Sequence, residues 1–171
     1  MSWSTVKKKS VIIREYSPND KSKIEKLAKS AFNGSSDAYW SVVGLERSDK
    51  TLVAEYNNEI VGVIEIEILT LNRERHGHIG YIFVHPKYQK RGIGSLLLEK
   101  ALSYLKEKNV KTVWALTSPS NKPTRNLFHK FQFEEIYNIK ELRKFLSGKA
   151  VKKLLRRMVY WSGDIILKLN L

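Results

Sequence analysis

Apolar residues recur along the chain at two spacings, which predict helices and strands in alternation. Spacings of three and four residues are clearest at Leu97, Leu98, Ala101, Leu102 and Leu105, which indicates a helix with one buried stripe. Alternating or continuously apolar runs indicate strands. The predicted strands cover residues 11–16, 51–56, 60–69, 78–85, 111–117, 133–139 and 164–170, and the predicted helices begin near residues 17, 37, 95 and 121. The chain is therefore expected to be an α/β (α+β) protein.

The strand predicted over residues 60–69 places two carboxylates side by side. Because alternate side chains of a strand point to the same face, Glu65 and Glu67 share a face with Val63, opposite Ile64 and Ile66. Such a pair suits acid–base chemistry. A solvated sheet face with two surface carboxylates explains the same pattern.

The composition limits the chemistry that the chain can use. The chain has 171 residues, 42% of them hydrophobic, which is enough to form the buried core of a single domain over residues 1–171. The absence of cysteine excludes disulfides and thiolate metal sites. The four histidines lack zinc spacing, and His76 and His78, which share a strand face, are expected at the surface or hydrogen-bonded. We expect no metal. No membrane span or signal segment is evident, so a cytoplasmic location is predicted.

The formal charge of +14 favours anionic partners, and half of this charge lies in one segment. Residues 140–157 hold eight lysines and arginines against Glu141 alone. An apolar stripe runs through residues 140–158, which predicts one kinked or two short amphipathic helices. Their basic face either recruits an acidic protein substrate, a nucleoprotein or an anionic membrane, or simply faces solvent. Residues 1–10 are expected to form a flexible basic N-terminus.

The loop from Gln89 to Ser95 joins a strand to a helix and carries basic residues and glycines. Free backbone N–H groups and the positive end of the helix dipole lie at such a position, so the loop can bind phosphate oxygens. The P-loop pattern fails because no lysine follows Gly94, and the dinucleotide pattern fails because Leu97 replaces its third glycine. A tight turn without a ligand explains the glycines as well.

The segment Gln89-Lys90-Arg91-Gly92-Ile93-Gly94 resembles the Gln/Arg-x-x-Gly-x-Gly/Ala motif of the GNAT superfamily of acetyl-CoA-dependent N-acetyltransferases. The preceding Val84-His85-Pro86, the following Leu-rich helix and the order of elements from Val11 to Phe133 are also similar. The resemblance implies a mixed, mostly antiparallel sheet with a splayed central strand pair, flanked by helices. The helical segment 140–158 would be an insertion before the last strand.

The resemblance also implies which residues bind acetyl-CoA, the expected cosubstrate. The pyrophosphate would be bound by Gln89, Lys90, Arg91, Gly92, Ile93, Gly94 and Ser95, and the pantetheine and thioester would be lined by Ile82, Phe83 and Val84. Asn121 matches the family's pantetheine-binding asparagine. Phe128, which stands where many members have a catalytic tyrosine, would also lie against the cofactor.

The acid–base residues depart from the commonest family pattern. Phe128 replaces the tyrosine that protonates the CoA thiolate, Leu116 stands at the fifth-strand glutamate position, and Gly80 and Tyr81 stand at the fourth-strand position. A CoA thiol is acidic enough to leave without an enzymic acid. Glu65, Glu67, His78 and Tyr81 remain as candidates for the base, and our hypothesis is that Glu67 orders the water that deprotonates the amine.

These features predict direct acetyl transfer from acetyl-CoA to a primary amine in a ternary complex. The acceptor is a protein N-terminus, a lysine or a small amine. The alternative is a CoA-binding sensor or interaction module that has lost catalysis, and the charge alone suggests a nucleic-acid-binding protein, although no specific nucleic-acid motif is present. Whether the chain forms a homodimer stays open.

Gln132 stands where the family usually has a glycine that ends a helix with positive φ. If that geometry is retained, a left-handed glutamine costs about 1 kcal/mol. The sequence therefore predicts strain or rearrangement at this corner.

Overall fold

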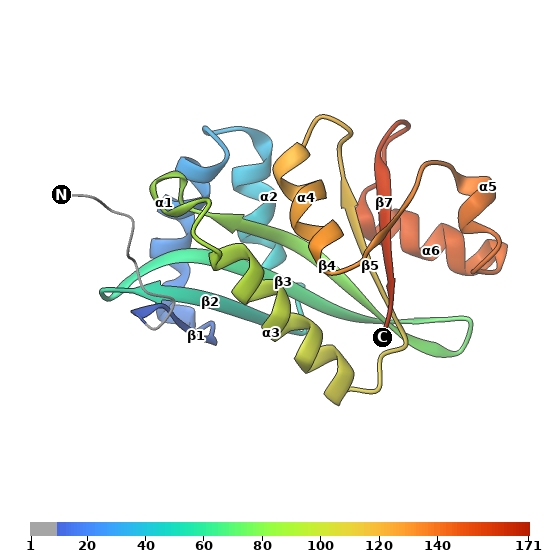
Figure 1. Ribbon diagram of the computed structural model, residues 1–171, viewed down its shortest axis with the longest axis horizontal. Helices are drawn as coiled ribbons and strands as arrows, with labels where there is room; N and C mark the ends of the chain where they lie inside the picture. Colours follow the sequence, from blue (N-terminus) through green and yellow to red (C-terminus); the bar gives the residue numbers. More distant parts are fainter. Residues whose placement is uncertain (1–9) are drawn as a thin grey trace. The chain divides into compact units, whose positions relative to one another are not determined.

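The computed structural model describes residues 10–171 (Figure 1). Its elements follow one another as strands with interposed helices, as the hydrophobic pattern predicts. They are β1 (Ile12–Glu15), η2 (Pro18–Asp20), α1 (Lys21–Ala31), α2 (Ser36–Gly44), β2 (Lys50–Tyr56), β3 (Glu59–Leu71), β4 (Glu74–Val84), η3 (Pro86–Tyr88), α3 (Ile93–Glu107), β5 (Thr112–Thr117), α4 (Lys122–Lys130), β6 (Glu134–Ile136), α5 (Ile139–Leu142), α6 (Gly148–Met158) and β7 (Ile165–Asn170).

The strands form one sheet in the order β1-β2-β3-β4-β5-β7-β6. The pairs β1–β2, β2–β3, β5–β7 and β6–β7 are antiparallel. By contrast, β4 and β5 pair in parallel, with a register from His76 opposite Thr112 to His78 opposite Trp114, although both strands continue further. The expectation of a mixed, mostly antiparallel sheet flanked by helices is confirmed.

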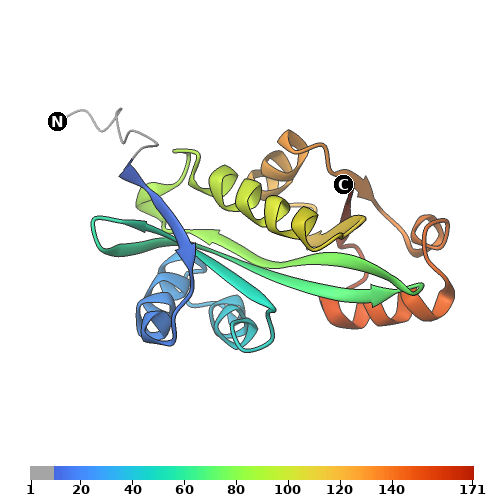
Figure 2. The same ribbon diagram turned by 90° about the horizontal axis from the view of Figure 1, so that it is seen from below.

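The described residues divide into two compact units, and the first comprises residues 10–67 and 80–104. Within unit 1, α1 and α2 cover one face of β2 and β3, and α3 covers the other (Figure 2). Ile24, Leu27, Val53, Val63 and Phe83 form a buried core on the α1–α2 side. Because Val63 belongs to this core, the odd-numbered side chains from Val63 to Glu67 point toward α1 and α2.

Unit 2 comprises residues 68–79 and 105–171. Its core is built by α5 and α6 against the strands, through buried residues that include Leu71, Trp114, Leu142, Leu154 and Ile166. The predicted segment 140–158 forms two helices rather than one kinked helix, because the chain breaks between Leu142 and Gly148. That the segment is an insertion, and that residues 1–171 form a single domain, stay predictions.

The largest differences from the predicted strand bounds are at β3, β4 and β6. β3 and β4 continue to a tight turn in which Asn72 and Arg73 both have positive φ, so β4 begins at Glu74 and not at His78. β6 stops at Ile136, because the Asn138 side chain accepts a hydrogen bond from the Glu141 N–H and so starts α5.

The corner after α4 keeps the predicted left-handed geometry. Gln132 has a φ of 65°. The Phe133 N–H donates to the Phe128 carbonyl and the Gln132 N–H donates to the His129 carbonyl, which together form a Schellman motif. The rings of Phe128 and Phe133, 4.8 Å apart between centroids, supply its hydrophobic contact. This packing holds a non-glycine residue in the left-handed region.

Two remaining expectations concern the N-terminus and the lack of a membrane-spanning segment. The predicted flexible N-terminus lies outside the described residues except for Ser10. Within residues 10–171, each helix is too short or too polar to cross a lipid bilayer.

Candidate active site

The loop between β4 and α3 is folded tightly upon itself. The Gln89 side chain donates through Nε2 to the Val84 carbonyl at 3.1 Å, and His85 Nδ1 accepts from the Lys87 N–H at 3.1 Å. Lys90 and Gly92 have positive φ values of 59° and 81°. A left-handed lysine costs about 1 kcal/mol, so the loop holds a shape that a relaxed connection would avoid.

This shape places free amides and positive charge at the start of α3. The Gly92 carbonyl accepts the first bond of the helix, from the Leu96 N–H at 3.0 Å, so the N–H groups of Ile93, Gly94 and Ser95 have no carbonyl partner in that helix. Lys90 is exposed, and the Arg91 guanidinium lies 5.3 Å from the Tyr88 ring centroid. Unit 1 thus brings together the residues predicted to bind a pyrophosphate.

The end of β4 carries the residues predicted to line pantetheine. Phe83 is buried in the unit 1 core, where its ring lies 5.1 Å from that of Phe32. Ile82 and Val84 point to the opposite face and are half-buried. The pairing of β4 with β5 covers residues 76–78 of β4, so the backbone of residues 82–84 lies beyond that ladder.

The carboxylates of β3 are buried, which corrects the alternative of a solvated face. Glu65 is 2% exposed and Glu67 is 7% exposed. Both side chains lie on the same face of β3 as Val63, and α1 and α2 cover this face. The alternating pattern of the sequence does not reveal that helices pack there. A methyl group on Gly44 of α2 would stand 2.1 Å from Glu65 Oε2, and one on Gly80 would stand 3.2 Å from it. The two glycines make room for the carboxyl group.

Burial changes the protonation of Glu65. The pKa of Glu65 is raised to about 9, chiefly because the carboxyl group is removed from water; a hydrogen bond from the Tyr81 N–H opposes this rise, and the negative charge of Glu67 adds to it. Within residues 10–171, Glu65 Oε1 has no hydrogen-bond partner. Glu65 is therefore a neutral carboxylic acid at pH 7, and this protonation keeps a second negative charge away from Glu67.

Tyr81 is held as a hydrogen-bond donor. Its hydroxyl donates to Asp37 Oδ1 at 2.9 Å, and burial together with the Asp37 charge raises the pKa of Tyr81 well above its usual value. Asp37 lies in the first turn of α2, where the helix dipole favours its negative charge. Tyr81 is thus a poor base, and its bond joins the start of α2 to β4.

His76 and His78 lie in unit 2 and are both buried, so neither occupies a surface position. The Trp114 Nε1–H donates to His76 Nδ1 at 3.0 Å, which confirms a hydrogen-bonded role for His76, and burial lowers the pKa of His76. His78 pairs opposite Trp114 in the β4–β5 ladder. Within residues 10–171, no group of three or more His, Asp or Glu side chains could hold a metal ion.

Asn121 directly precedes α4 and Phe128 lies within it, both in unit 2. The Asn121 side chain caps this helix by accepting from the Thr124 N–H at 3.2 Å, as the sequence predicts. Phe128 is 1% exposed and packs against Phe133. Their predicted contacts with the cofactor stay predictions.

Sequence reasoning missed Asp37 and Gly44. The helix that contains them was predicted over residues 37–45, but its pattern of apolar residues does not say that its two ends meet Tyr81 and Glu65. A small residue at Gly44, opposite a strand with two carboxylates, was the signal that could have been used.

Comparisons with known proteins agree with this arrangement. The family model of the acetyltransferase (GNAT) family matches residues 19–133. An N-alpha-acetyltransferase of Sulfurisphaera tokodaii is 31% identical over 147 residues, which are 80% of this chain and 88% of that protein. An uncharacterized N-acetyltransferase of Archaeoglobus fulgidus is 32% identical over 83 residues, 47% of this chain, and the match spans only 56% of that relative's length.

The fold also matches that of a solved structure. The PaiA N-acetyltransferase of Thermoplasma acidophilum, in complex with coenzyme A, gives a TM-score of 0.72 at 16% identity and covers 95% of this chain and 99% of its own. The family model, which spans most of the chain, shows that this protein belongs to the GNAT family of acetyltransferases. Its class is that of an acetyl-CoA-dependent acyltransferase.

Proposed function

We infer that this protein transfers the acetyl group of acetyl-CoA to the α-amino group of a protein N-terminus. The observation that carries this inference is the combination, in unit 1, of an amide-rich loop at the start of α3 with a buried pair of carboxyl groups on β3. Anion binding and acid–base chemistry are the two requirements of the reaction.

The loop residues fit the diphosphate of acetyl-CoA. The N–H groups of Ile93, Gly94 and Ser95 would hold the phosphate oxygens, and Lys90 would add charge. The left-handed φ at Gly92 exposes backbone without a side chain in the way. When bound, acetyl-CoA supplies an activated acetyl thioester. The backbone of residues 82–84 would hold its pantetheine arm.

Glu65 and Glu67 would divide the acid–base work between them. Since Glu65 keeps its proton, Glu67 is the carboxylate available to order a water molecule and accept the proton of the amine. An α-amino group has a pKa near 8, so little free energy is needed to deprotonate it. A lysine amine, with a pKa about 2 units higher, would need more from the same carboxylate.

An N-terminal amine acceptor is supported by the relative from Sulfurisphaera tokodaii, whose name assigns it N-alpha-acetyltransferase activity. The acceptor would approach along α2, where Tyr39 and Trp40 are 64% and 48% exposed, with their rings 5.1 Å apart. Asp37 lies on the same helix and offers a negative charge to a cationic amine. These three side chains are our candidates for acceptor recognition.

Thiol release from acetyl-CoA tests this function. We expect turnover with peptides that have a free N-terminus, and none with the same peptides when the N-terminus is blocked and only a lysine amine remains. Glu67→Gln should lower kcat at least a hundredfold without weakening acetyl-CoA binding, since general-base catalysis contributes about 10²- to 10⁴-fold. The exposed Glu59→Gln on the same strand is the matched control.

The result also separates the alternative of a CoA-binding sensor. A sensor would bind acetyl-CoA with full affinity but release no thiol with any peptide or small amine. Faster turnover of the blocked, lysine-bearing peptides would show that the acceptor is a lysine side chain and not a protein N-terminus. Equal kcat for Glu67→Gln and wild type would remove Glu67 from the mechanism.

A further inference from the structure

Positive charge is concentrated in unit 2. Residues 68–79 and 105–171 hold 17 of the 31 basic residues but six of the 17 acidic ones, so this unit carries +11 of the formal charge of +14. Much of this charge lies on exposed residues of α5, α6 and the loop between them. We define the cationic face as Arg143, Lys144, Lys149, Lys152 and Arg156, all of them exposed.

The cationic face is not neutralised from within. In residues 10–171, no salt bridge joins any of its five side chains to a carboxylate. Elsewhere basic residues do have acidic partners: Arg14 pairs with Asp20, and Arg125 with Glu135. The face therefore presents its full charge to solvent.

The sequence of α6 is unfavourable for an isolated helix. It contains no acidic residue, and Lys149 lies in its first turn, at the positive end of the helix dipole. Lys149, Lys152 and Arg156 follow one another at spacings of three and four residues, where like charges repel. A polyanion bound along this side would remove both penalties.

The opposite side of α6 is already occupied. Val151, Leu154 and Met158 are buried in the core of unit 2, and Lys153 Nζ donates to the Thr70 carbonyl at 2.9 Å. A helix that lies in a membrane surface buries its apolar side in the lipid. Since that side of α6 packs against the protein, the membrane is disfavoured as a partner.

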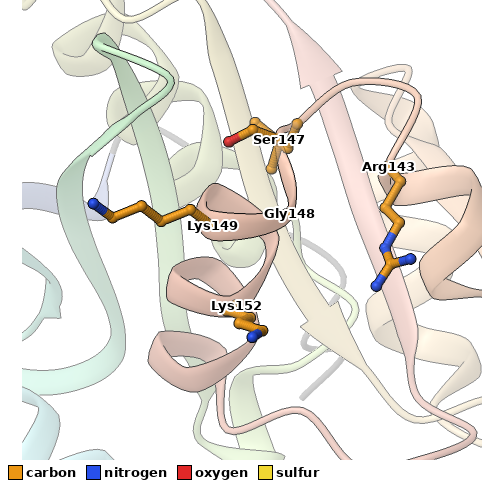
Figure 3. Close-up of a pocket in the computed structure, with 6 residues that line it drawn as sticks. Arg143, Ser147, Gly148, Lys149 and Lys152 are labelled. Carbon is orange, nitrogen blue, oxygen red and sulfur yellow. The ribbon is translucent and has the colours of Figure 1, made fainter.

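A hollow of about 690 Å³ opens at the start of α6. It is lined by Arg143, Leu146, Ser147, Gly148, Lys149 and Lys152. In the view of Figure 3, Arg143 and Lys149 lie on opposite sides of the first turn of α6. Ser147 closes this turn by accepting a hydrogen bond from the Ala150 N–H. Arg143, Lys149 and Lys152 therefore bring positive charge to the lining of this hollow.

Exposed aromatic rings lie beyond each end of α6. Phe145 is 45% exposed before the helix, and Trp161 is 74% exposed after it. The Trp161 backbone is fixed, because its N–H donates to Asp164 Oδ2 at 2.9 Å and its carbonyl accepts from the Asp164 N–H at 3.0 Å. A helix of 11 residues is about 16 Å long, so the rings bracket a cationic stretch of that order.

We propose that the cationic face of α6 and of the loop before it, with Phe145 and Trp161, binds a single-stranded polynucleotide. Cationic grooves flanked by stacking aromatic rings bind single strands with little dependence on sequence, because every base has a π-face. An acidic peptide would use the cations but would leave the exposed indole of Trp161 without a planar partner. This surface uses none of the residues proposed for acetyl transfer.

Fluorescence anisotropy with labelled U20 RNA and dT20 DNA tests this proposal. The variant Arg143→Gln/Lys149→Gln/Lys152→Gln/Arg156→Gln should bind at least tenfold more weakly at 100 mM salt. Its plot of log affinity against log salt should be less steep by about 3, since each phosphate contact to a single strand contributes about 0.7. Trp161→Ala should lower affinity about fivefold or more through lost stacking.

The matched control removes the same charge from elsewhere: Lys26→Gln/Lys29→Gln/Lys100→Gln/Lys106→Gln, all at exposed positions outside α5 and α6. It should lose much less affinity than the cationic-face variant. Circular dichroism checks that both fold, and Trp161→Ala provides a test that removes no charge. Binding of both U20 and dT20 supports recognition of phosphates and bases, and binding of U20 alone supports the proposal with an added 2′-hydroxyl contact.

Three results would overturn the proposal. One is an equal loss of oligonucleotide affinity in the cationic-face variant and in the control, which would show that only the net charge of the protein matters. Another is tighter binding of polyglutamate, or of phosphatidylserine vesicles, than of either oligonucleotide. The third is no binding of U20 or dT20 by the wild-type chain at 50 mM salt.

Discussion

Gly44 of α2 faces the carboxyl group of Glu65, and a methyl group at position 44 would stand 2.1 Å from Glu65 Oε2. A methyl group at position 80 would stand 3.2 Å from the same oxygen. The absence of a side chain at Gly44 is therefore a condition for the position that Glu65 occupies. Helix α2 sets the place of this carboxyl as well as covering it.

Gly44→Ala is expected to displace Glu65 while leaving the fold intact, because the atom that the methyl group meets is the end of a side chain. We expect kcat to fall about tenfold, or 1.4 kcal/mol, with the KM for acetyl-CoA unchanged. Steady-state kinetics checks this. In a Glu65→Ala background the same substitution should have no further effect on kcat, and an equal loss in both backgrounds would contradict the account.

The raised pKa of Glu65 makes stability depend on pH. The folded protein holds this proton up to about pH 9, whereas the unfolded chain releases it near pH 4.5. Its contribution to stability is therefore complete below about pH 4.5 and is lost as pH rises toward 9. Glu65→Gln, which stays neutral, should match wild type near pH 4 and be more stable at pH 7 by about 3 kcal/mol.

Urea unfolding at pH 4, 7 and 9 measures this difference. Glu59→Gln, at an exposed position of the same strand, serves as the control and should follow wild type throughout. Stability curves of Glu65→Gln and wild type that stay parallel from pH 4 to 9 would show that Glu65 titrates normally.

The hydrogen bond from Tyr81 to Asp37 should matter for the acceptor more than for the coenzyme. Tyr81→Phe removes the hydroxyl that joins β4 to α2, and we expect a loss of about 1 kcal/mol in the free energy of unfolding. The KM for the peptide should rise while the KM for acetyl-CoA stays constant. Asp37→Asn should give a similar change, and the double variant should be no worse than either single one.

Gln132 offers a test of backbone strain that is independent of function. Gln132→Gly should raise the free energy of unfolding by about 1 kcal/mol, because glycine adopts a φ of 65° without a steric penalty. Gln132→Ala keeps the Cβ atom and should leave stability near that of wild type. Thermal unfolding compares the three proteins, and a destabilised glycine variant would show that the glutamine is not strained.

Much of the fold could be predicted from periodicity alone. The stripe of leucines in α3 and the alternation in β3 define a buried face on each element, and the Schellman corner at Gln132 follows from a helix that must end before Phe133. Strand ends were less certain. The start of β4 is polar, so its pairing rests on the left-handed turn at Asn72 and Arg73 and not on apolar residues.

The site was predicted unevenly, for a physical reason. The binding loop is local, because its glycines, basic residues and helix start are contiguous in the sequence. The carboxylate pair is not local: its burial depends on a helix about 20 residues earlier, and Gly44 and Asp37 have no pattern that links them to Glu65 and Tyr81. Alternation assigns a side chain to a face but does not say what covers that face.

The most direct test of the acetyltransferase assignment is calorimetric titration with acetyl-CoA and with S-acetylpantetheine, which lacks the diphosphate. Gly92→Ala places a Cβ atom where φ is 81°, whereas Gly34→Ala imposes similar strain at a φ of 69° in open space. We predict that Gly92→Ala weakens acetyl-CoA binding at least tenfold, leaves S-acetylpantetheine unaffected, and that Gly34→Ala changes neither. No heat of binding from acetyl-CoA to the wild-type protein, or equal effects of the two substitutions, would contradict the assignment of the diphosphate to the loop before α3.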